Sequence, residues 1–496
     1  MKNICLITPP SPFLLDERVF IHLGILKVAS SLETAGHKVD FLDLSGIENY
    51  LDVVRDYCKT STVDVFGITA STPQVPFAVC IGKLIKETIP HSKLILGGPH
   101  VTLMNTAHKR ELKKGLDISD RATQDIGSLR QIFDVLVCGD GELAIFEALT
   151  LNSGIVDADD KKSPHFLTNA QVSSLPFPAR HLVDIDSYQY FIEDRKATSL
   201  IAQLGCPFQC SFCSGRNSPF LRKIRQRTPE SIITELRYLH EEYGYTGFMF
   251  YDDELNVNKG LIDLLNKISD LQSELGVEFR LRGFIKAELF NDAQADAMYR
   301  AGFRWLLTGF ESGDERILKN IKKMATRDDN TRAVEIAQRH NLKVKALMSI
   351  GHAGETWETV ENTKKWLLEV GPEEFDCTII TTYPGSPYFD DAVKEGDVYV
   401  YTSDQTGDKL YQSAIDYLSE LDYYKGDPNG GYISYVWTDH MTPQQLVNAR
   451  DLLEKEVRKK LNIPFNNARS SAKYEHSMGM GNIQIPDFIF RKTLLS

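Results

Sequence analysis

The sequence contains no apolar run that approaches the roughly 18 residues needed to cross a membrane. Its first residues, MKNICLITPP, hold a short apolar run that stops at two prolines, too short for the core of a signal peptide. Cysteine is also scarce, with eight in 496 residues, whereas small secreted domains are dense in disulfides. These absences predict a cytoplasmic protein with reduced thiols and no membrane partner.

Positive charge is in short supply as well. Lysine and arginine number 56 against 68 acidic residues, and the formal net charge is -12. A general nucleic-acid binder needs a basic face, so we expect no nucleic-acid partner. The content of 42% hydrophobic and 25% charged residues is ordinary for a globular protein.

Two nucleotide-binding motifs are missing too. No G-x-G-x-x-G follows the first strand-like run, and no G-x-x-x-x-G-K-[ST] occurs. The strings GGP and GDGE leave a plain dinucleotide-binding domain as a minor alternative.

The chain does contain two blocks in which strand-like and helix-like stretches alternate. Short apolar runs in the first block, separated by helices, predict a parallel sheet covered on both faces. We therefore expect a doubly wound, Rossmann-like α/β domain over residues 1–150, followed by a proline-bearing linker over 151–196. The strand-like runs of this block are NICLIT, KVDFLDL, VDVFGIT, SKLILGG and FDVLVCGDGE.

Six βα units follow in the second block, which is too few for a closed eight-fold barrel. Residues 197–390 are expected to form a partial (β/α)6 barrel with its chemistry at the C-terminal ends of the strands. Residues 391–496 are predicted to be a small, mainly helical region that shapes the substrate pocket. The strand candidates are TSLIAQL, GFMFYDD, EFRLRGF, FRWLLTGFE, KVKALMSIG and DCTIIT.

Three cysteines, Cys206, Cys210 and Cys213, directly follow the first strand of the second block. Four thiolates would saturate a zinc ion or an iron–sulfur cluster, whereas three hold three irons of a [4Fe–4S] cluster and leave the fourth open. Zinc with a distant fourth ligand and an uncommitted thiol loop are the alternatives. The other five cysteines are scattered and are expected to be buried hydrophobes.

The spacing CxxxCxxC, with Phe212 before the last cysteine, resembles the signature of the radical S-adenosylmethionine (SAM) enzymes. The resemblance implies that the amino and carboxylate groups of SAM chelate the open iron. It also implies that one electron cleaves SAM to a 5′-deoxyadenosyl radical, so a one-electron reductant such as flavodoxin or ferredoxin is an expected partner.

Further pieces at consecutive strand ends are similar to the SAM-binding parts of that family. Acidic residues after the second strand are candidates for the methionine amino group, although a solvated acidic loop is the alternative. An arginine after the third strand could hold the carboxylate by a bidentate contact, a glutamate after the fourth could accept from a ribose hydroxyl, and a glycine after the fifth lets backbone approach adenine. Besides Phe212, these residues are Asp252, Asp253, Glu254, Arg282, Glu311, Ser349 and Gly351.

The first block resembles the cobalamin-binding domain of a large radical SAM subclass, and LPFPAR (175–180) resembles the linker between the two domains. Together the resemblance covers most of residues 1 to about 389. Loops that leave C-terminal strand ends in an open α/β sheet are where a large cofactor binds. The expected cobalamin-binding residues are Ser71, Thr72, Gln74, Gly97, Gly98, His100, Thr102, Gly139, Gly141 and Glu142.

The Asp-x-His-x-x-Gly string that supplies a lower axial histidine in some cobalamin proteins is absent. Cobalamin is therefore expected to bind base-off, without a histidine at its lower face. His100 is more simply a loop histidine with ordinary hydrogen bonds.

The resemblance implies a cobalamin-dependent radical SAM enzyme, with methyl transfer to an unactivated carbon or phosphorus of a small molecule as the expected reaction. Radical cyclisation, ring contraction or oxidation without methyl transfer is the alternative within enzymes. A non-catalytic iron–sulfur sensor or binding protein is the alternative from another class. No residue is assigned here as a catalytic acid or base.

Overall fold

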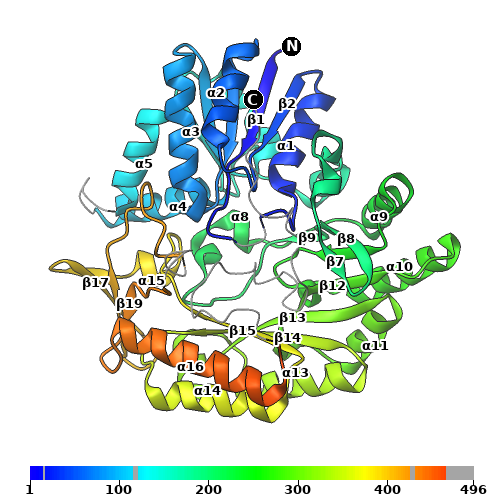
Figure 1. Cartoon of the computed structure of the whole chain (residues 1–496), viewed down its shortest axis with the longest axis vertical. Helices are drawn as coiled ribbons and strands as arrows, with labels where there is room; N and C mark the ends of the chain where they lie inside the picture. The colour runs from blue at the N-terminus through cyan, green and yellow to red at the C-terminus, as the bar shows by residue number, and fades with distance from the viewer. Residues whose placement is uncertain (15–16, 116–120, 425–430, 465–496) are drawn as a thin grey trace.

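The N-terminal domain is a six-stranded parallel sheet with helices on both faces (Figure 1). The computed structural model describes residues 1–14, 17–115, 121–424 and 431–464. The strand order is β2-β1-β3-β4-β5-β6, so the topology reverses between β1 and β3. Such a switch point opens a crevice at the C-terminal strand ends. The strands are β1 (Asn3–Thr8), β2 (Lys38–Asp43), β3 (Val65–Thr69), β4 (Lys93–Gly97), β5 (Val135–Gly139) and β6 (Gly154–Ala158).

Apolar side chains on both faces of these strands explain why helices cover the sheet twice. One face packs on α1 and α6 through residues such as Leu6 and Ile95, and the other packs on α2 to α5 through residues such as Phe66 and Leu96. The helices are α1 (Leu23–Thr34), α2 (Tyr50–Thr60), α3 (Val75–Thr88), α4 (Pro99–Lys114), α5 (Arg121–Ile132) and α6 (Gly141–Thr150). The predicted doubly wound fold is confirmed.

The second block forms an open half-barrel of six parallel strands, as expected, with the short β7 added antiparallel at one edge. The sheet order is β15-β14-β13-β12-β11-β8-β7. Its strands are β7 (Phe191–Ile192), β8 (Arg195–Leu200), β11 (Gly247–Phe250), β12 (Arg280–Phe284), β13 (Phe303–Glu311), β14 (Lys343–Ile350) and β15 (Glu374–Ile379).

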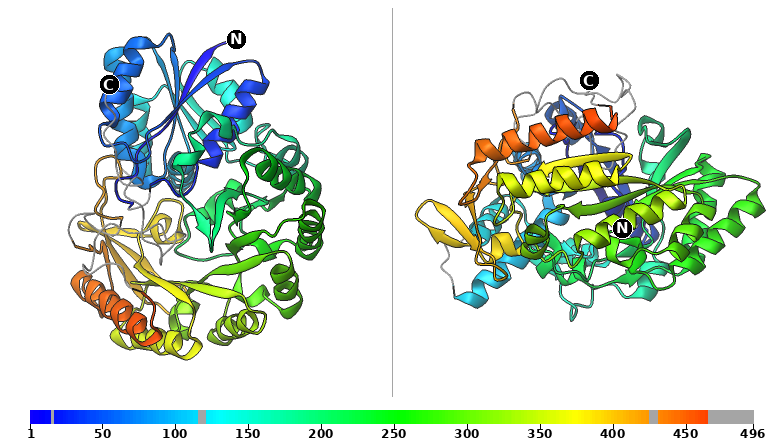
Figure 2. Two further views of the ribbon diagram at one scale, coloured as in Figure 1. Left: turned by 45° about the vertical axis from the view of Figure 1, so that its right-hand side comes forward. Right: turned by 90° about the horizontal axis from the view of Figure 1, so that it is seen from below.

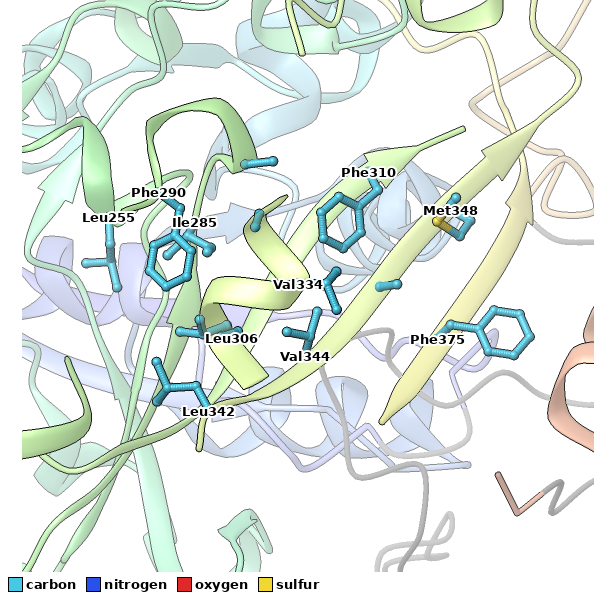
Figure 3. Close-up of a cluster of buried hydrophobic side chains, with 14 of the residues drawn as sticks. Leu255, Ile285, Phe290, Leu306, Phe310, Val334, Leu342, Val344, Met348 and Phe375 are labelled. Carbon is cyan, nitrogen blue, oxygen red and sulfur yellow. The ribbon is translucent and has the colours of Figure 1, made fainter. Parts of the chain in front are cut away.

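Outward-facing apolar residues of these strands pack against a shell of helices. Leu306 and Val344 lie beside Val334 of α13, and Met348 belongs to the same buried cluster (Figure 3). The helices are α9 (Pro229–Tyr243), α10 (Leu261–Leu275), α11 (Asp292–Arg300), α12 (Glu315–Asn320), α13 (Arg327–Arg339) and α14 (Trp357–Val370), with the short α7 (Asn169–Ser174) and α8 (Pro219–Arg222) nearer the N-terminal domain. Among the described residues, no helix combines the length and the hydrophobicity that a membrane span requires.

The C-terminal region differs from the mainly helical expectation. Helix α16 (Pro443–Leu461) packs on β15 and α14, but a four-stranded antiparallel sheet precedes it. These strands have two to five residues, too short for a reliable period-2 pattern. They are β16 (Val393–Glu395), β17 (Val398–Thr402), β18 (Lys409–Ser413) and β19 (Val436–Trp437), after the short α15 (Pro387–Asp390).

The predicted linker, 151–196, is more ordered than a linker. It begins with β6, which pairs with β5, and it ends with β7 and the start of β8. Arg180 of LPFPAR is 1% exposed, and its guanidinium donates to Glu235 Oε1 of α9 at 2.8 Å. A buried ion pair therefore attaches this segment to the barrel. The C-terminal edge of the N-terminal sheet faces the open side of the half-barrel (Figure 2).

Candidate active site between the two domains

The cysteine loop begins where β8 ends. Gly205 adopts a φ of +89°, and a side chain there would collide with the Lys223 carbonyl. The loop is held by the antiparallel pair β9 (Gln203–Leu204) and β10 (Arg225–Gln226). The Cys206 N–H donates to Leu221 O at 2.8 Å, and the Cys213 N–H donates to Cys210 O at 3.2 Å. The backbone thus curls the three thiols around one region of the barrel mouth.

The three thiols share one electrostatic environment. Burial raises the pKa of Cys206 and of Cys213 to about 12. Burial also raises the pKa of Cys210, while the ammonium groups of Lys323 and Lys286 lower it. Cys213 keeps accessible surface although protein surrounds it, as expected for a thiol facing an internal space. Binding iron would convert these thiols to thiolates.

No group of three His, Cys, Asp or Glu side chains within the described part of the chain is arranged around a single metal ion. A [4Fe–4S] cluster asks for a different arrangement, because each cysteine binds a different iron. Three neighbouring thiols with two cations near them fit such a cluster better than they fit zinc.

The acidic residues after β11 divide into different roles. Asp252 is buried and accepts hydrogen bonds from the backbone N–H groups of Ala202 and Gln203. It therefore fixes the loop after β8. Asp253 accepts from the Gly205 N–H, so it too supports the cysteine loop.

Glu254 is the acid that fits a ligand. Burial raises its pKa to about 7, against the lowering effect of Lys323 and Lys286. Its Oε2 is buried and has no hydrogen-bond partner among the described residues. A buried carboxylate oxygen without a partner is costly, and an ammonium group of a bound amino acid would satisfy it.

A hydrogen-bonded network runs across the ends of β13 and β14. Glu311 has a φ of +67° beside an irregularity in the β13–β14 register. Its Oε1 lies 3.3 Å from Lys323 Nζ, and its Oε2 accepts from Ser349 Oγ at 2.7 Å. Ser349 Oγ also lies 2.8 Å from His352 Nε2. Burial and the nearby Lys323 lower the pKa of His352 to about 3, so its imidazole is neutral.

Lys323 was not predicted as a site residue, yet it lies at the centre of this network. It is 5% exposed, and its neighbours Lys322 and Met324 both have left-handed φ values, of 52° and 66°. Such backbone is strained for residues other than glycine and often marks a functional position. Lys286 Nζ donates to the Lys323 carbonyl at 2.7 Å. Lys323 lies in the loop between α12 and α13, which no strand-end pattern covers, whereas Lys286 lies just after β12, where strand-end reasoning could have found it.

The other predicted SAM-binding residues, Phe212, Arg282 and Gly351, lie outside this hydrogen-bonded network. Phe212 packs on Ile317 and Ile321, with its ring 5.4 Å from that of His352. Arg282 is buried inside the barrel, with its guanidinium 5.9 Å from the Trp305 ring centroid. A Cβ on Gly351 would lie 3.1 Å from Ile379 Cγ2, so packing against protein by itself favours glycine at this position.

Two cavities adjoin the C-terminal edge of the N-terminal sheet. The first has a volume of about 280 Å³ and lies between β1, β3, β4 and β5 on one side and α1 and α6 on the other, and Ile201, Leu204, Phe220 and Leu221 of the second block also line it. The second has a volume of about 460 Å³ and is lined by both domains. Gly24 lines both, and a Cβ built on it would meet no atom within 4 Å. An open backbone face between two adjoining cavities fits a large cofactor with an extended tail.

The predicted cobalamin-binding residues fall into groups. Ser71 and Gln74 line the larger cavity, while Gly97, Gly98, Thr102, Gly139, Gly141 and Glu142 line the smaller. Thr72 and His100 line neither of these two cavities.

His100 is fully buried with its Nδ1 3.3 Å from Thr72 Oγ1, and burial lowers its pKa to about 3.

Contacts within the protein explain why several of the predicted cobalamin-binding positions are glycine. A Cβ on Gly98 would lie 2.7 Å from Thr69 Oγ1, and one on Gly141 would lie 2.9 Å from Val28 Cγ2. Bulky changes at Gly98 or Gly141 would therefore disturb the fold itself, so they do not test cobalamin binding.

Asp140 of the GDGE string has a structural role. It forms a buried ion pair with Arg225 of β10, whose guanidinium also lies 4.6 Å from the Phe166 ring centroid. Asp159, just after β6, accepts from Ser218 Oγ at 2.7 Å and from the Phe220 N–H at 2.7 Å. The N-terminal domain therefore holds the segment that follows the cysteine loop.

Comparisons with known proteins agree with this geometry. A model of the radical SAM superfamily matches residues 200–367, and a model of the B12-binding domain matches residues 17–118. The chain therefore carries a radical SAM domain and a B12-binding domain. It is an enzyme of the cobalamin-dependent radical SAM class, whose cofactors are a [4Fe–4S] cluster, SAM and cobalamin.

Among similar proteins, an uncharacterised methyltransferase of Pyrococcus horikoshii is 27% identical over 409 residues, which cover 79% of this chain and 83% of that protein. The hopanoid C-3 methylase of Methylococcus capsulatus is 24% identical over 412 residues, covering 78% and 71%. An anaerobic magnesium-protoporphyrin IX monomethyl ester cyclase of Rubrivivax gelatinosus is 24% identical over 383 residues, covering 74% and 65%.

The solved radical SAM methyltransferase TsrM of Kitasatospora setae, with cobalamin and a [4Fe–4S] cluster bound, superposes with a TM-score of 0.66. The alignment covers 91% of each chain at 16% sequence identity. At this identity the likeness establishes the fold alone.

Proposed function

We propose that this enzyme transfers a methyl group to an unactivated carbon centre, or to phosphorus, of a small molecule. One observation carries the proposal: the cavity of about 460 Å³ is lined by Ser71 and Gln74 of the N-terminal domain and by Ser199, Ile201 and Tyr251 of the barrel. A cofactor on the sheet edge and a radical source at the barrel mouth would both open into it. Curated relatives named as methyltransferases support the proposal.

The residues described above supply the surroundings for this chemistry. Cys206, Cys210 and Cys213 would hold the cluster, and Glu254 would accept from the amino group of SAM. Lys323 would keep a positive charge beside the Cys210 thiolate and the Glu311 carboxylate. When bound, the cofactors would supply a radical that removes hydrogen and a methyl group to replace it. The enzyme would work in the cytoplasm and receive its electron from a one-electron reductant such as flavodoxin or ferredoxin.

The test uses SAM carrying a deuterated methyl group. The anaerobic holoenzyme is incubated with an extract of small molecules, and products are compared by mass spectrometry with those from unlabelled SAM. Methyl transfer predicts a product that keeps the label. The similarity to the Rubrivivax cyclase favours one other function, a radical cyclisation without methyl transfer. In that case SAM would be cleaved and a product would form without label, which would refute the proposal.

A further inference from the structure

The larger cavity has a wall of aromatic rings contributed by distant parts of the chain. Phe13 and Phe20 come from the segment after β1, Tyr251 from the end of β11 and Tyr424 from the C-terminal region. Aliphatic side chains complete this wall, among them Ile21, Leu23, Ile25 and Ile201. The surface offered to a small molecule is thus largely apolar.

The rings are fixed by contacts with one another. The Phe20 ring lies 4.6 Å from that of Tyr190 and 5.3 Å from that of Tyr251, while Phe13 and Tyr424 are 4.9 Å apart and meet edge to face. Phe20 thereby joins the apolar cluster inside the barrel, which contains Met249 and Leu307. A segment of the N-terminal domain therefore forms part of the barrel's own mouth.

The carboxylate and the amide of this wall, on Glu17 and Gln74, are already hydrogen bonded within the protein. Glu17 Oε2 accepts from the N–H groups of Ser11 and Gly46, each at 2.7 Å. Gln74 uses both ends of its amide, because Oε1 accepts from the Ser71 N–H and Nε2 donates to the Pro9 carbonyl. Among the described lining residues Glu17 is the one acid or base beside His22, whose pKa burial lowers.

We propose that the molecule accepting the methyl group is uncharged at its reacting end and carries a flat ring that lies against Phe20 and Tyr251. This inference rests on the proposed function and narrows it to a carbon centre. Flat rings gain offset-stacking and edge-to-face contacts in such a wall. A phosphoryl or carboxylate group would lose its hydration among apolar side chains and bonded polar groups, which is costly.

The experiment measures binding without needing turnover. The full chain, reconstituted anaerobically and saturated with hydroxocobalamin and SAM, is dialysed against 2-naphthol and, separately, 2-naphthyl phosphate. The two probes have the same ring and differ in charge. Phe20→Ala is compared with Tyr299→Ala, because Tyr299 on α11 is 39% exposed and far from the cavity wall.

We expect one 2-naphthol to bind per chain and 2-naphthyl phosphate to bind at least about tenfold more weakly. Phe20→Ala should weaken 2-naphthol binding about five- to tenfold, whereas Tyr299→Ala should leave it unchanged. If Phe20→Ala fails to fold, Tyr424→Leu gives the same test at another ring of this wall. Equal binding of both probes, no binding, or no effect of either cavity variant would overturn the inference.

Failure of this inference and failure of the proposed function can be told apart. A labelled product with an anionic reacting group would overturn the inference and leave methyl transfer standing. Ring binding without any labelled product would leave the inference standing and overturn methyl transfer.

Discussion

Replacing Lys323 with methionine removes one buried charge from the candidate site and keeps the volume of the side chain. Lys323 Nζ lies 3.3 Å from Glu311 Oε1, and a Cβ on Gly309 would crowd both groups, at 2.6 and 3.2 Å. Although burial opposes it, the carboxylates of Glu311 and Glu254 and the Cys210 thiolate together raise the pKa of Lys323. The lysine is therefore charged when the site is formed.

Without this ammonium group, two effects weaken SAM binding. The Glu311 carboxylate loses a charged partner in a mostly buried position, and the pKa of Glu254, already about 7, moves upward because Lys323 lowers it. A protonated Glu254 cannot accept from the amino group of SAM as a carboxylate does. Losing one charge-assisted contact of this kind costs about 1.5–3 kcal/mol, so SAM affinity should fall roughly 10- to 150-fold.

The assay is equilibrium dialysis of SAM with the anaerobically reconstituted protein, together with iron analysis. Lys322→Met is the matched control, because its ammonium points away and pairs with Asp404 at 2.6 Å near the surface. It should change the affinity by less than about 0.5 kcal/mol. Equal SAM affinity in Lys323→Met and the native protein, with the cluster intact, would refute this account of the lysine.

Three further outcomes are expected. Cys210→Ala should lose the iron of the cluster, about four atoms per chain, whereas Cys377→Ala, buried away from the loop, should keep it. Arg225→Met should cost about 3–5 kcal/mol of stability in denaturant unfolding because it leaves Asp140 buried and unpaired, while Arg237→Met, at an exposed ion pair, should cost less than about 1 kcal/mol. Burial, with Asp416 and Glu111, raises the pKa of Asp125 to about 7. A folded pKa above the unfolded value makes the free energy of unfolding fall as pH rises from about 4 to 7. Asp125→Asn should therefore flatten that fall, and an unchanged slope of stability against pH would contradict this prediction.

Sequence reasoning located the parts of the site that lie at strand ends. The cysteine loop, Glu254 and Glu311 follow parallel strands, whose C-terminal ends must meet at one edge of a sheet. Which of the three consecutive acids keeps a carboxylate oxygen without a hydrogen-bond partner among the described residues could not be predicted. Asp252 and Asp253 turn toward backbone N–H groups of the β8 loop, a tertiary contact that leaves no local pattern.

The loop residues of the site and the roles of its glycines could not be predicted either, because tertiary contacts determine both. Lys323 reaches the site through left-handed backbone at Lys322 and Met324, which no periodicity encodes. Gly98 and Gly141 could be placed after strand ends, but only the structure shows that neighbouring protein atoms fill the space beside them. The open face at Gly24 lies in an ordinary helical stretch, so nothing in the sequence distinguished it.

The central claim is that cobalamin binds at the edge of the N-terminal sheet, beside the cluster barrel. Titrating hydroxocobalamin into the iron-loaded chain tests it most directly. We predict one cobalamin per chain, a base-off absorption spectrum, and no nitrogen superhyperfine splitting in the electron paramagnetic resonance of the reduced cobalt(II) form. Gly24→Leu should fill the open face and abolish binding with the iron content unchanged, whereas Gly127→Leu, at an equally open position on α5, should bind as the native chain does. If the native chain binds no cobalamin yet still cleaves SAM to 5′-deoxyadenosine, or if Gly24→Leu binds cobalamin normally, the claim is contradicted.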